Sequence, residues 1–167
     1  MSRKRSHYRP RPVNLLAHMQ AIADAHVPPL DYRAGWAAKL AQCVDAVRRG
    51  TATQDDWAEV FDACNLLQEL VFMRIAQDVD GCVQAAMDAC AAIVNRQVDT
   101  GVRAARASEL QALYDMQRNW CDLMDNVSLA ERDRAIKRFR ARHQHIARGG
   151  AVPPGVRVIR APEAVAA

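Results

Sequence analysis

The sequence predicts an all-α protein: a single-domain bundle of five or six helices, with a flexible basic arm before it and an unstructured tail after it. Only seven of the 167 residues are glycine and seven are proline, and most of these cluster at positions 28–50, at 101 and after 148. Long stretches therefore lack a helix breaker, and apolar residues recur in them at helical spacing. The length suffices for one hydrophobic core. We expect an arm at residues 1–12, a helical domain at 13–148 and a tail at 149–167.

The first helix is expected at residues 15–26. Asn14 is a candidate N-cap, and Pro28 and Pro29 end the helix because proline cannot continue it. Its apolar side consists of Leu15, Leu16, Met19 and Ile22.

The second helix is expected between Asp31, a candidate cap, and Gly50. Arg48 and Arg49 stand in its last turn, where cations suit the negative end of the helix dipole. Its apolar stripe is Trp36, Leu40, Cys43, Val44 and Val47.

The third helix is expected to begin after Thr53, because Thr53 and Asp56 have the spacing of a capping box. It carries apolar residues on two faces, which is typical of a helix in the middle of a bundle. One face is Trp57, Phe61, Cys64, Leu67 and Val71, and the other is Leu66, Leu70 and Met73.

A fourth helix, with Asp78 or Asp80 as cap, is expected to run to Gly101, with Val79, Val83, Ala86, Cys90 and Ile93 on its apolar stripe. Capping-box spacing at Ser108 with Gln111 and at Ser128 with Glu131 predicts a fifth and a sixth helix, the last ending at Gly149-Gly150. No glycine or proline stands at 126–128, so the sequence leaves open whether these two helices form one rod.

Charge is divided unevenly along the chain. Residues 1–12 hold five Lys or Arg and no acid, residues 13–128 hold nine against sixteen acids, and residues 129–167 hold nine against three, so that the net +4 is made of +5, −7 and +6. Segregated charge acts on the approach of partners, so the pattern favours a binding protein. The candidate contact residues are Arg3, Lys4, Arg5, Tyr8, Arg9 and Arg11 in the arm and Arg134, Lys137, Arg138 and Arg142 in the last helix.

The last helix admits three interpretations. Its basic face is an ordinary solvated face or pairs with the acidic body, it contacts an acidic patch of another protein, or it binds the phosphates of a nucleic acid. Base stacking requires aromatic side chains. Only Tyr8 and Phe139 are available, and Phe139 is expected on the core side together with Leu129, Ile136, His143 and Ile146.

No motif of catalysis or cofactor binding is present. The sequence lacks G-x-G-x-x-G, G-x-x-x-x-G-K-[ST], H-E-x-x-H and G-x-S-x-G. The five cysteines include no C-x-x-C pair and lie on expected apolar faces, which favours buried reduced thiols. His143 and His145 are two residues apart and point to different sides of a helix, so they cannot share a metal. We predict no catalytic residue, metal or cofactor.

Neither a membrane span nor a secretory signal is expected, because no apolar run approaches the length that a bilayer requires. The sequence therefore predicts a cytoplasmic protein without membrane contact.

The opening of the chain, R-K-R-S-H-Y-R-P-R-P-V at residues 3–13, resembles that of small helical proteins of tailed phages and prophages of proteobacteria, which begin with a basic K-x-x-Y-R-P-x-x-V segment. The run R-G-T-A-T-Q-D-D-W at 49–57 is similar to the turn between two helices in that group, and residues 108–136 resemble its last long helix. The resemblance implies a phage or prophage origin and an all-helical fold, and it implies no activity.

Together these observations predict a non-enzymatic protein that acts by occupying a surface on a host or phage macromolecule. By analogy, an inhibitor of host defence of the anti-CRISPR kind is expected. The partner would be a host or phage protein, a nucleoprotein complex included. The alternative is a nucleic-acid-binding accessory protein that uses the arm and the last helix. The sequence leaves the oligomeric state open, a homodimer included.

Overall fold

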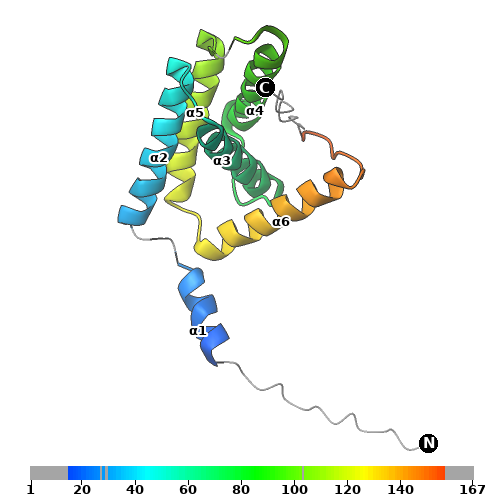
Figure 1. The fold of residues 1–167 in the computed structure, drawn as a ribbon. Coiled ribbons are helices and arrows are strands. Elements are labelled where there is room, and N and C mark those ends of the chain that lie inside the picture. The colour runs from blue at the N-terminus through cyan, green and yellow to red at the C-terminus, as the bar shows by residue number, and fades with distance from the viewer. Residues whose placement is uncertain (1–14, 27, 29, 103, 157–167) are drawn as a thin grey trace, which may run out of the picture.

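The structure, a computed structural model, describes residues 15–26, 28, 30–102 and 104–156. These residues form six α-helices and one short 3-10 helix, and the described part contains no strand (Figure 1). The elements are α1 (Leu15–Asp24), α2 (Leu30–Arg49), α3 (Gln54–Phe72), η1 (Val79–Gly81), α4 (Cys82–Thr100), α5 (Ala107–Met124) and α6 (Leu129–Ala147). The predicted all-α bundle is confirmed.

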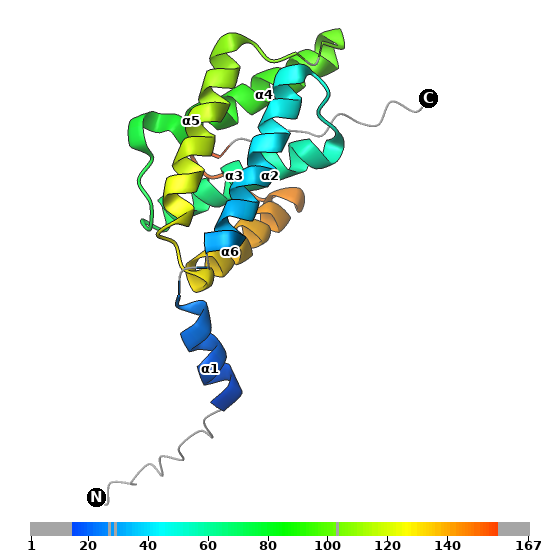
Figure 2. The same ribbon diagram turned by 90° about the vertical axis from the view of Figure 1, so that its left-hand side faces the viewer.

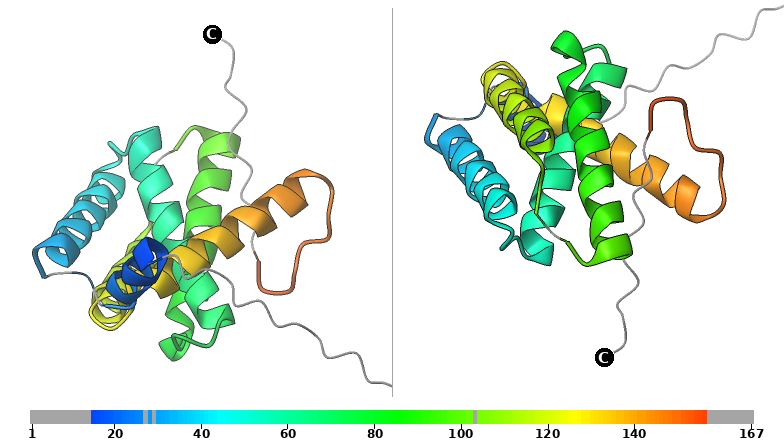
Figure 3. Two further views of the ribbon diagram at one scale, coloured as in Figure 1. Left: turned by 90° about the horizontal axis from the view of Figure 1, so that it is seen from below. Right: turned by 90° about the horizontal axis from the view of Figure 1, so that it is seen from above.

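Helix α3 lies in the middle of the bundle, as its two apolar faces predict. It contacts α2, α4, α5 and α6, and every residue from 66 to 70 is buried, whichever way its side chain points. Val60, Cys64, Leu67 and Leu70 are completely shielded from solvent. One core therefore joins the five helices from α2 to α6, and α6 crosses α3 at the lower end of the bundle (Figures 1 and 3).

The capping hydrogen bonds in the structure confirm two of the predicted helix starts. The N–H of Asp56 donates to Thr53 Oγ1 at 3.2 Å, and the N–H of Thr53 donates to the Asp56 carboxylate at 2.8 Å. Ser128 and Glu131 exchange the same two bonds at 3.3 and 3.0 Å. Because Ser128 has extended backbone angles, α5 and α6 are two helices and not one rod.

The predicted caps of α5, α2 and α4 are wrong by a few residues. Helix α5 begins at Ala107, and Glu109 rather than Gln111 closes its first turn by accepting the N–H of Arg106 at 2.7 Å. A carboxylate is a stronger acceptor at a helix N-terminus than an amide. Helix α2 begins at Leu30, so Asp31 lies inside its first turn. The cap expected for α4 is displaced as well: the N-cap is Gly81 and not Asp78 or Asp80, although the Asp78 carboxylate accepts the N–H of Val83 in the first turn at 2.9 Å.

After α6 the chain turns back towards α3. The N–H of Val156 donates to the carbonyl of Pro153 at 3.2 Å, and Gly155 at the third position has φ +79°. These are the features of a type II turn, in which proline favours the second position and glycine the third. Gln68 of α3 holds the turn by donating to the Gly155 carbonyl at 2.9 Å. The expected tail thus has a defined path to residue 156, and residues 157–167 lie outside the described part.

Helix α1 ends at Asp24, two residues earlier than expected, and projects from the bundle (Figure 2). Its candidate cap, Asn14, lies outside the described residues, as does the whole arm. None of the described helices combines the length and the apolarity that crossing a bilayer requires.

Candidate partner-binding surface

The cations of α6 divide into those that the chain pairs internally and those that it leaves at the surface. Arg142 belongs to the first group. Its guanidinium forms an ion pair with Glu69 of α3, and the two side chains are only 13% and 2% exposed. Arg138 Nε lies 3.5 Å from the other oxygen of the same carboxylate, with the Arg138 side chain 59% exposed.

Burial lowers the pKa of Arg142, while the nearby Glu69 opposes that shift. A guanidinium stays charged even so, because its ordinary pKa is far above neutral. Arg142 therefore neutralises a buried carboxylate, and the contacts of this predicted partner-binding residue are intramolecular.

Arg134 and Lys137 lie at the surface, as the sequence predicts. Lys137 Nζ is 4.0 Å from Asp133, and both side chains are largely exposed, so that this pair holds the lysine weakly. Arg140 is also exposed, and the sequence analysis did not select it. Helical periodicity puts Arg140 on the exposed side of α6. The sequence alone does not show this, because it does not show which side of α6 is buried.

Arg132 is a second cation that the sequence analysis passed over, and its role is structural. Its guanidinium lies 3.7 Å from the ring centroid of Trp36 in α2. Desolvation lowers the pKa of this arginine. The contact fixes the first half of α6 against α2.

Phe139 is not on the core side of α6, contrary to the prediction. It is half-buried, its ring centroid is 6.0 Å from that of His143, and it is not among the residues packed against the core. With Arg140, His143 and Gln144 it lines a shallow groove on α6. Of the other residues expected on that side, Ile136 does pack against the core and His143 is exposed. Ala135 and Arg142 complete the buried side, where Arg142 pairs with Glu69.

Helix α1 meets the rest of the structure at the start of α6. Among the helices, α1 contacts only α6 in the described part of the chain, and the N–H of Leu129 donates to the His26 carbonyl at 3.3 Å. Its predicted apolar side is exposed: Leu16, Met19 and Ile22 have 78, 59 and 52% of their surface in solvent. The six candidate residues of the arm, Arg3, Lys4, Arg5, Tyr8, Arg9 and Arg11, lie outside the described residues.

A second shallow groove follows α5, and it is polar. Its lining is Gln111, Tyr114, Gln117, Arg118, Cys121 and Asp122. Burial raises the pKa of Cys121, so that its thiol is protonated at neutral pH and is a poor nucleophile. The same cause raises the pKa of Cys43 to about 11.

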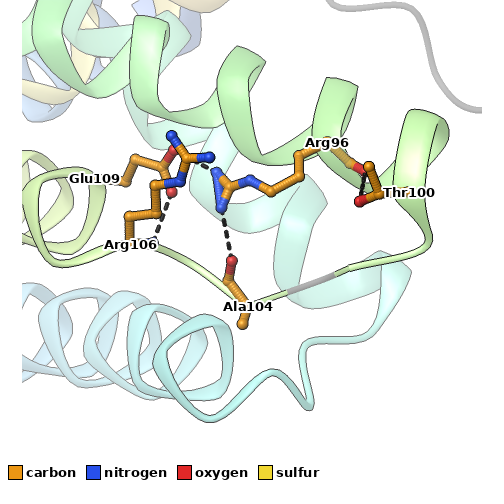
Figure 4. Close-up of polar contacts among 5 residues, drawn as sticks. All are labelled: Arg96, Thr100, Ala104, Arg106 and Glu109. Atoms are coloured by element: carbon orange, nitrogen blue, oxygen red, sulfur yellow. Dashed lines mark hydrogen bonds and ion pairs between the residues drawn. The ribbon is translucent and has the colours of Figure 1, made fainter.

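A partly buried polar cluster joins α4 to α5 (Figure 4). Arg96 forms an ion pair with Glu109, donates to the Ala104 carbonyl at 2.9 Å, and is 14% exposed. Arg106 supplies Glu109 with a backbone N–H. Arg96 and Glu109 thus have their partners inside the chain, which is the arrangement of a structural clasp. The described residues contain no group of three or more His, Cys, Asp or Glu positioned to hold a metal.

Comparison with protein-family models, with curated protein sequences and with solved structures finds no match to this chain.

Proposed function

We propose that this chain is a non-enzymatic binding protein that occupies an acidic surface on a host or phage macromolecule. The surface that would make the contact is the basic end, defined as residues 1–12 together with the exposed cations Arg134, Lys137, Arg138 and Arg140 of α6. Support comes from one observation above all: internal carboxylates neutralise Arg142 but leave Arg134 and Arg140 without an ion pair among the described residues. Unpaired charge on one end of a molecule steers association with an opposite charge.

Inhibition of host defence, of the anti-CRISPR kind, is the form of this function that we propose, and it places the protein in the host cytoplasm. The support is the resemblance of the opening segment to phage proteins, together with an analogy: small phage proteins whose sequences lack catalytic motifs act mainly by binding.

The test is recovery of partners from host lysate with a tagged chain. We expect a protein partner that is lost when Tyr8 and Arg9 become alanine and when Lys137→Glu and Arg140→Glu reverse two charges on α6. Arg118→Glu is the matched control, since Arg118 is 75% exposed and belongs to α5 rather than α6. Recovery that is unaffected by both sets of substitutions would remove the proposal.

Nucleic-acid binding is the second candidate function, and Phe139 is the observation that favours it. A half-buried phenylalanine beside Arg140 and His143 offers a ring on which an unpaired base can stack. If about six cations met phosphates, the logarithm of affinity would fall with that of salt with a slope of roughly −5. Phe139→Ala would then weaken binding to a single strand about tenfold. A chain that binds neither duplex nor single strand at low salt excludes this function.

A further inference from the structure

Helix α1 holds the least explained apolar surface of the molecule. Three large side chains, Leu16, Met19 and Ile22, follow one another at three-residue spacing and are each more than half exposed. Other exposed large apolar residues stand singly, such as Phe72 and Tyr114, or in pairs, as do Leu30 with Tyr32 in α2 and Val98 with Val102 around the end of α4. Single exposed apolar residues are ordinary, but an aligned set on one helix indicates a contact surface.

The fold fixes α1 at one end only. Pro28 is buried, and Leu129 donates to the carbonyl of His26, so the connection to α2 is held against the start of α6. The helix itself points away from the bundle (Figures 1 and 2). A ten-residue helix is marginal in water by itself, and covering its apolar face would stabilise it.

The charges around α1 indicate what kind of surface covers it. From Met1 to Asp24 the sequence holds five cations, all of which precede the helix, and one acid, Asp24, at the last residue of the helix. The helix carries no Lys or Arg of its own. An apolar face directly preceded by a basic segment is complementary to an apolar groove with carboxylates at its rim.

We propose that α1 is a docking helix that places Leu16, Met19 and Ile22 in an apolar groove of a partner protein, while the cations of the arm meet acidic residues at the rim of that groove. This inference rests on the proposed function and specifies the chemistry of its partner. Amphipathic helices are recognised in grooves by anchors at such spacing.

Other occupants fit the observations less well. The phosphates of a nucleic acid would pair with the cations of the arm, but they would not cover the apolar face of α1. Helices that lie on membranes carry Lys or Arg on their polar side, and α1 has neither. A second copy of the chain offers α1 itself, but that helix brings a single carboxylate, Asp24, for the five cations of each arm.

The test uses the full chain and a synthetic probe, a helical hairpin whose groove is lined by leucine and flanked by glutamate. Two matched probes replace either the glutamates by glutamine or the leucines by serine. Calorimetry measures binding by the natural chain and by the double variant Met19→Ser with Ile22→Ser. Ala21→Ser is the control, since Ala21 is exposed on the opposite side of α1.

We expect the leucine and glutamate probe to bind, and the double variant to bind it roughly tenfold more weakly or worse, because two apolar side chains lose their burial. Ala21→Ser should leave affinity within about twofold, and all three chains should melt at the same temperature, since α1 lies outside the core. The amide hydrogens of residues 15–24 should exchange more slowly with the probe present. The glutamine probe should bind more weakly and with less dependence on salt.

Failure to bind the leucine and glutamate probe, or equal affinities of the double variant and the natural chain, overturns the inference. It is also overturned if the double variant instead loses binding to vesicles of phosphatidylcholine and phosphatidylglycerol, or loses self-association in sedimentation. If the double variant keeps a lysate partner that the Tyr8→Ala, Arg9→Ala variant loses, the docking helix is wrong and the proposed function stands. If every variant still binds both the lysate partner and the synthetic probe, the docking helix and the proposed function are both wrong.

Discussion

Glu69 is the residue that decides what the basic face of α6 does. Glu69 lies in the last turn of α3 with 2% of its side chain exposed, and two arginines of α6 approach its carboxylate. A buried charge must be paired, because the cost of removing it from water is otherwise not offset. Part of a face that looks uniformly cationic in the sequence is therefore internal structure.

The pair predicts an asymmetric response to substitution. Glu69→Gln leaves Arg142 largely buried without its counter-charge and should lower the unfolding free energy by about 3 kcal/mol. Replacing both residues by methionine should recover stability to within about 1 kcal/mol of the natural chain, since apolar residues of similar size fill the site without a charge. Urea denaturation followed by circular dichroism measures both effects.

Lys137→Ala is the control for this pair. Its partner Asp133 is 4.0 Å away in solvent, and we expect a change within about 0.5 kcal/mol. A Glu69→Gln variant as stable as the natural chain would contradict the role assigned to the buried pair.

The helix caps make stability depend on pH. Hydrogen bonds from Thr53 and Ser128 lower the pKa of Asp56 and of Glu131 from their ordinary values of 3.8 and 4.5. A carboxyl group whose pKa is lowered on folding stabilises the folded state above its ordinary pKa, and that contribution is lost as pH falls through the lowered value. The unfolding free energy should therefore fall as the pH is lowered from about 5 to 3. Asp62 opposes this trend, because burial and the neighbouring Glu59 raise its pKa.

Thermal melting at neutral and acidic pH checks the cap contribution. Ser128→Ala should cost about 1 kcal/mol near neutral pH, and the difference from the natural chain should shrink at acidic pH, where Glu131 is protonated. Ser108→Ala is the matched control: Ser108 lies exposed inside the first turn of α5 and caps nothing in the structure. An equal loss from both substitutions would show that the capping bonds do not cause it.

At the scale of elements, the connection between α4 and α5 depends on one arginine. Arg96 reaches from the last turns of α4 to Glu109 at the start of α5 and to the carbonyl of Ala104 between them (Figure 4). Arg96→Ala should lower the unfolding free energy by about 3 kcal/mol, because Glu109 stays nine-tenths buried with its ion pair gone. Denaturation gives the loss, and hydrogen exchange should show faster exchange at residues 104–109.

Arg118→Ala is a fitting comparison for the clasp. Arg118 lies 3.8 Å from Asp115 on the surface of α5, with 75% of its side chain exposed, and its removal should change stability by less than about 0.5 kcal/mol. If Arg96→Ala behaves like Arg118→Ala, the clasp does not hold the two helices.

At the scale of the molecule, the core predicts one cooperative unfolding transition. The buried residues of α2 to α6 form a single cluster, and α3 contributes to it on every side. Trp36, Trp57 and Trp120 report from three different helices, so their fluorescence and the helical circular dichroism signal should change at the same urea concentration. Two separated transitions would contradict a single core.

The distribution of charge is also a property of the whole molecule. Glu69 forms ion pairs with Arg142 and with the more exposed Arg138, and the ring of Trp36 packs against Arg132. The proposed basic end is what remains after these internal contacts, and it is smaller than the sequence analysis suggested.

Local signals in the sequence determined the helices of this protein. Apolar periodicity located α2 to α6, and the capping boxes at Thr53 and Ser128 located two starts correctly, because a cap depends on residues within one turn of each other. The buried position of α3 was also predictable, since a helix with two apolar faces has no side to offer to water. The cap at Ser108 failed because the deciding residue, Glu109, is held by Arg96 from the preceding helix.

Only the tertiary structure decided which charges and which apolar side chains are left for a partner. The sequence led to Arg138 and Arg142 as contact residues and not to Arg140, and it showed an apolar side of α1 without showing what covers it. The fold pairs Arg142 with a carboxylate 73 residues earlier in the chain. It leaves Phe139 outside the set of residues packed against the core, and it leaves the apolar side of α1 exposed. These outcomes depend on contacts between residues far apart in sequence, and such contacts exist only when the helices have packed.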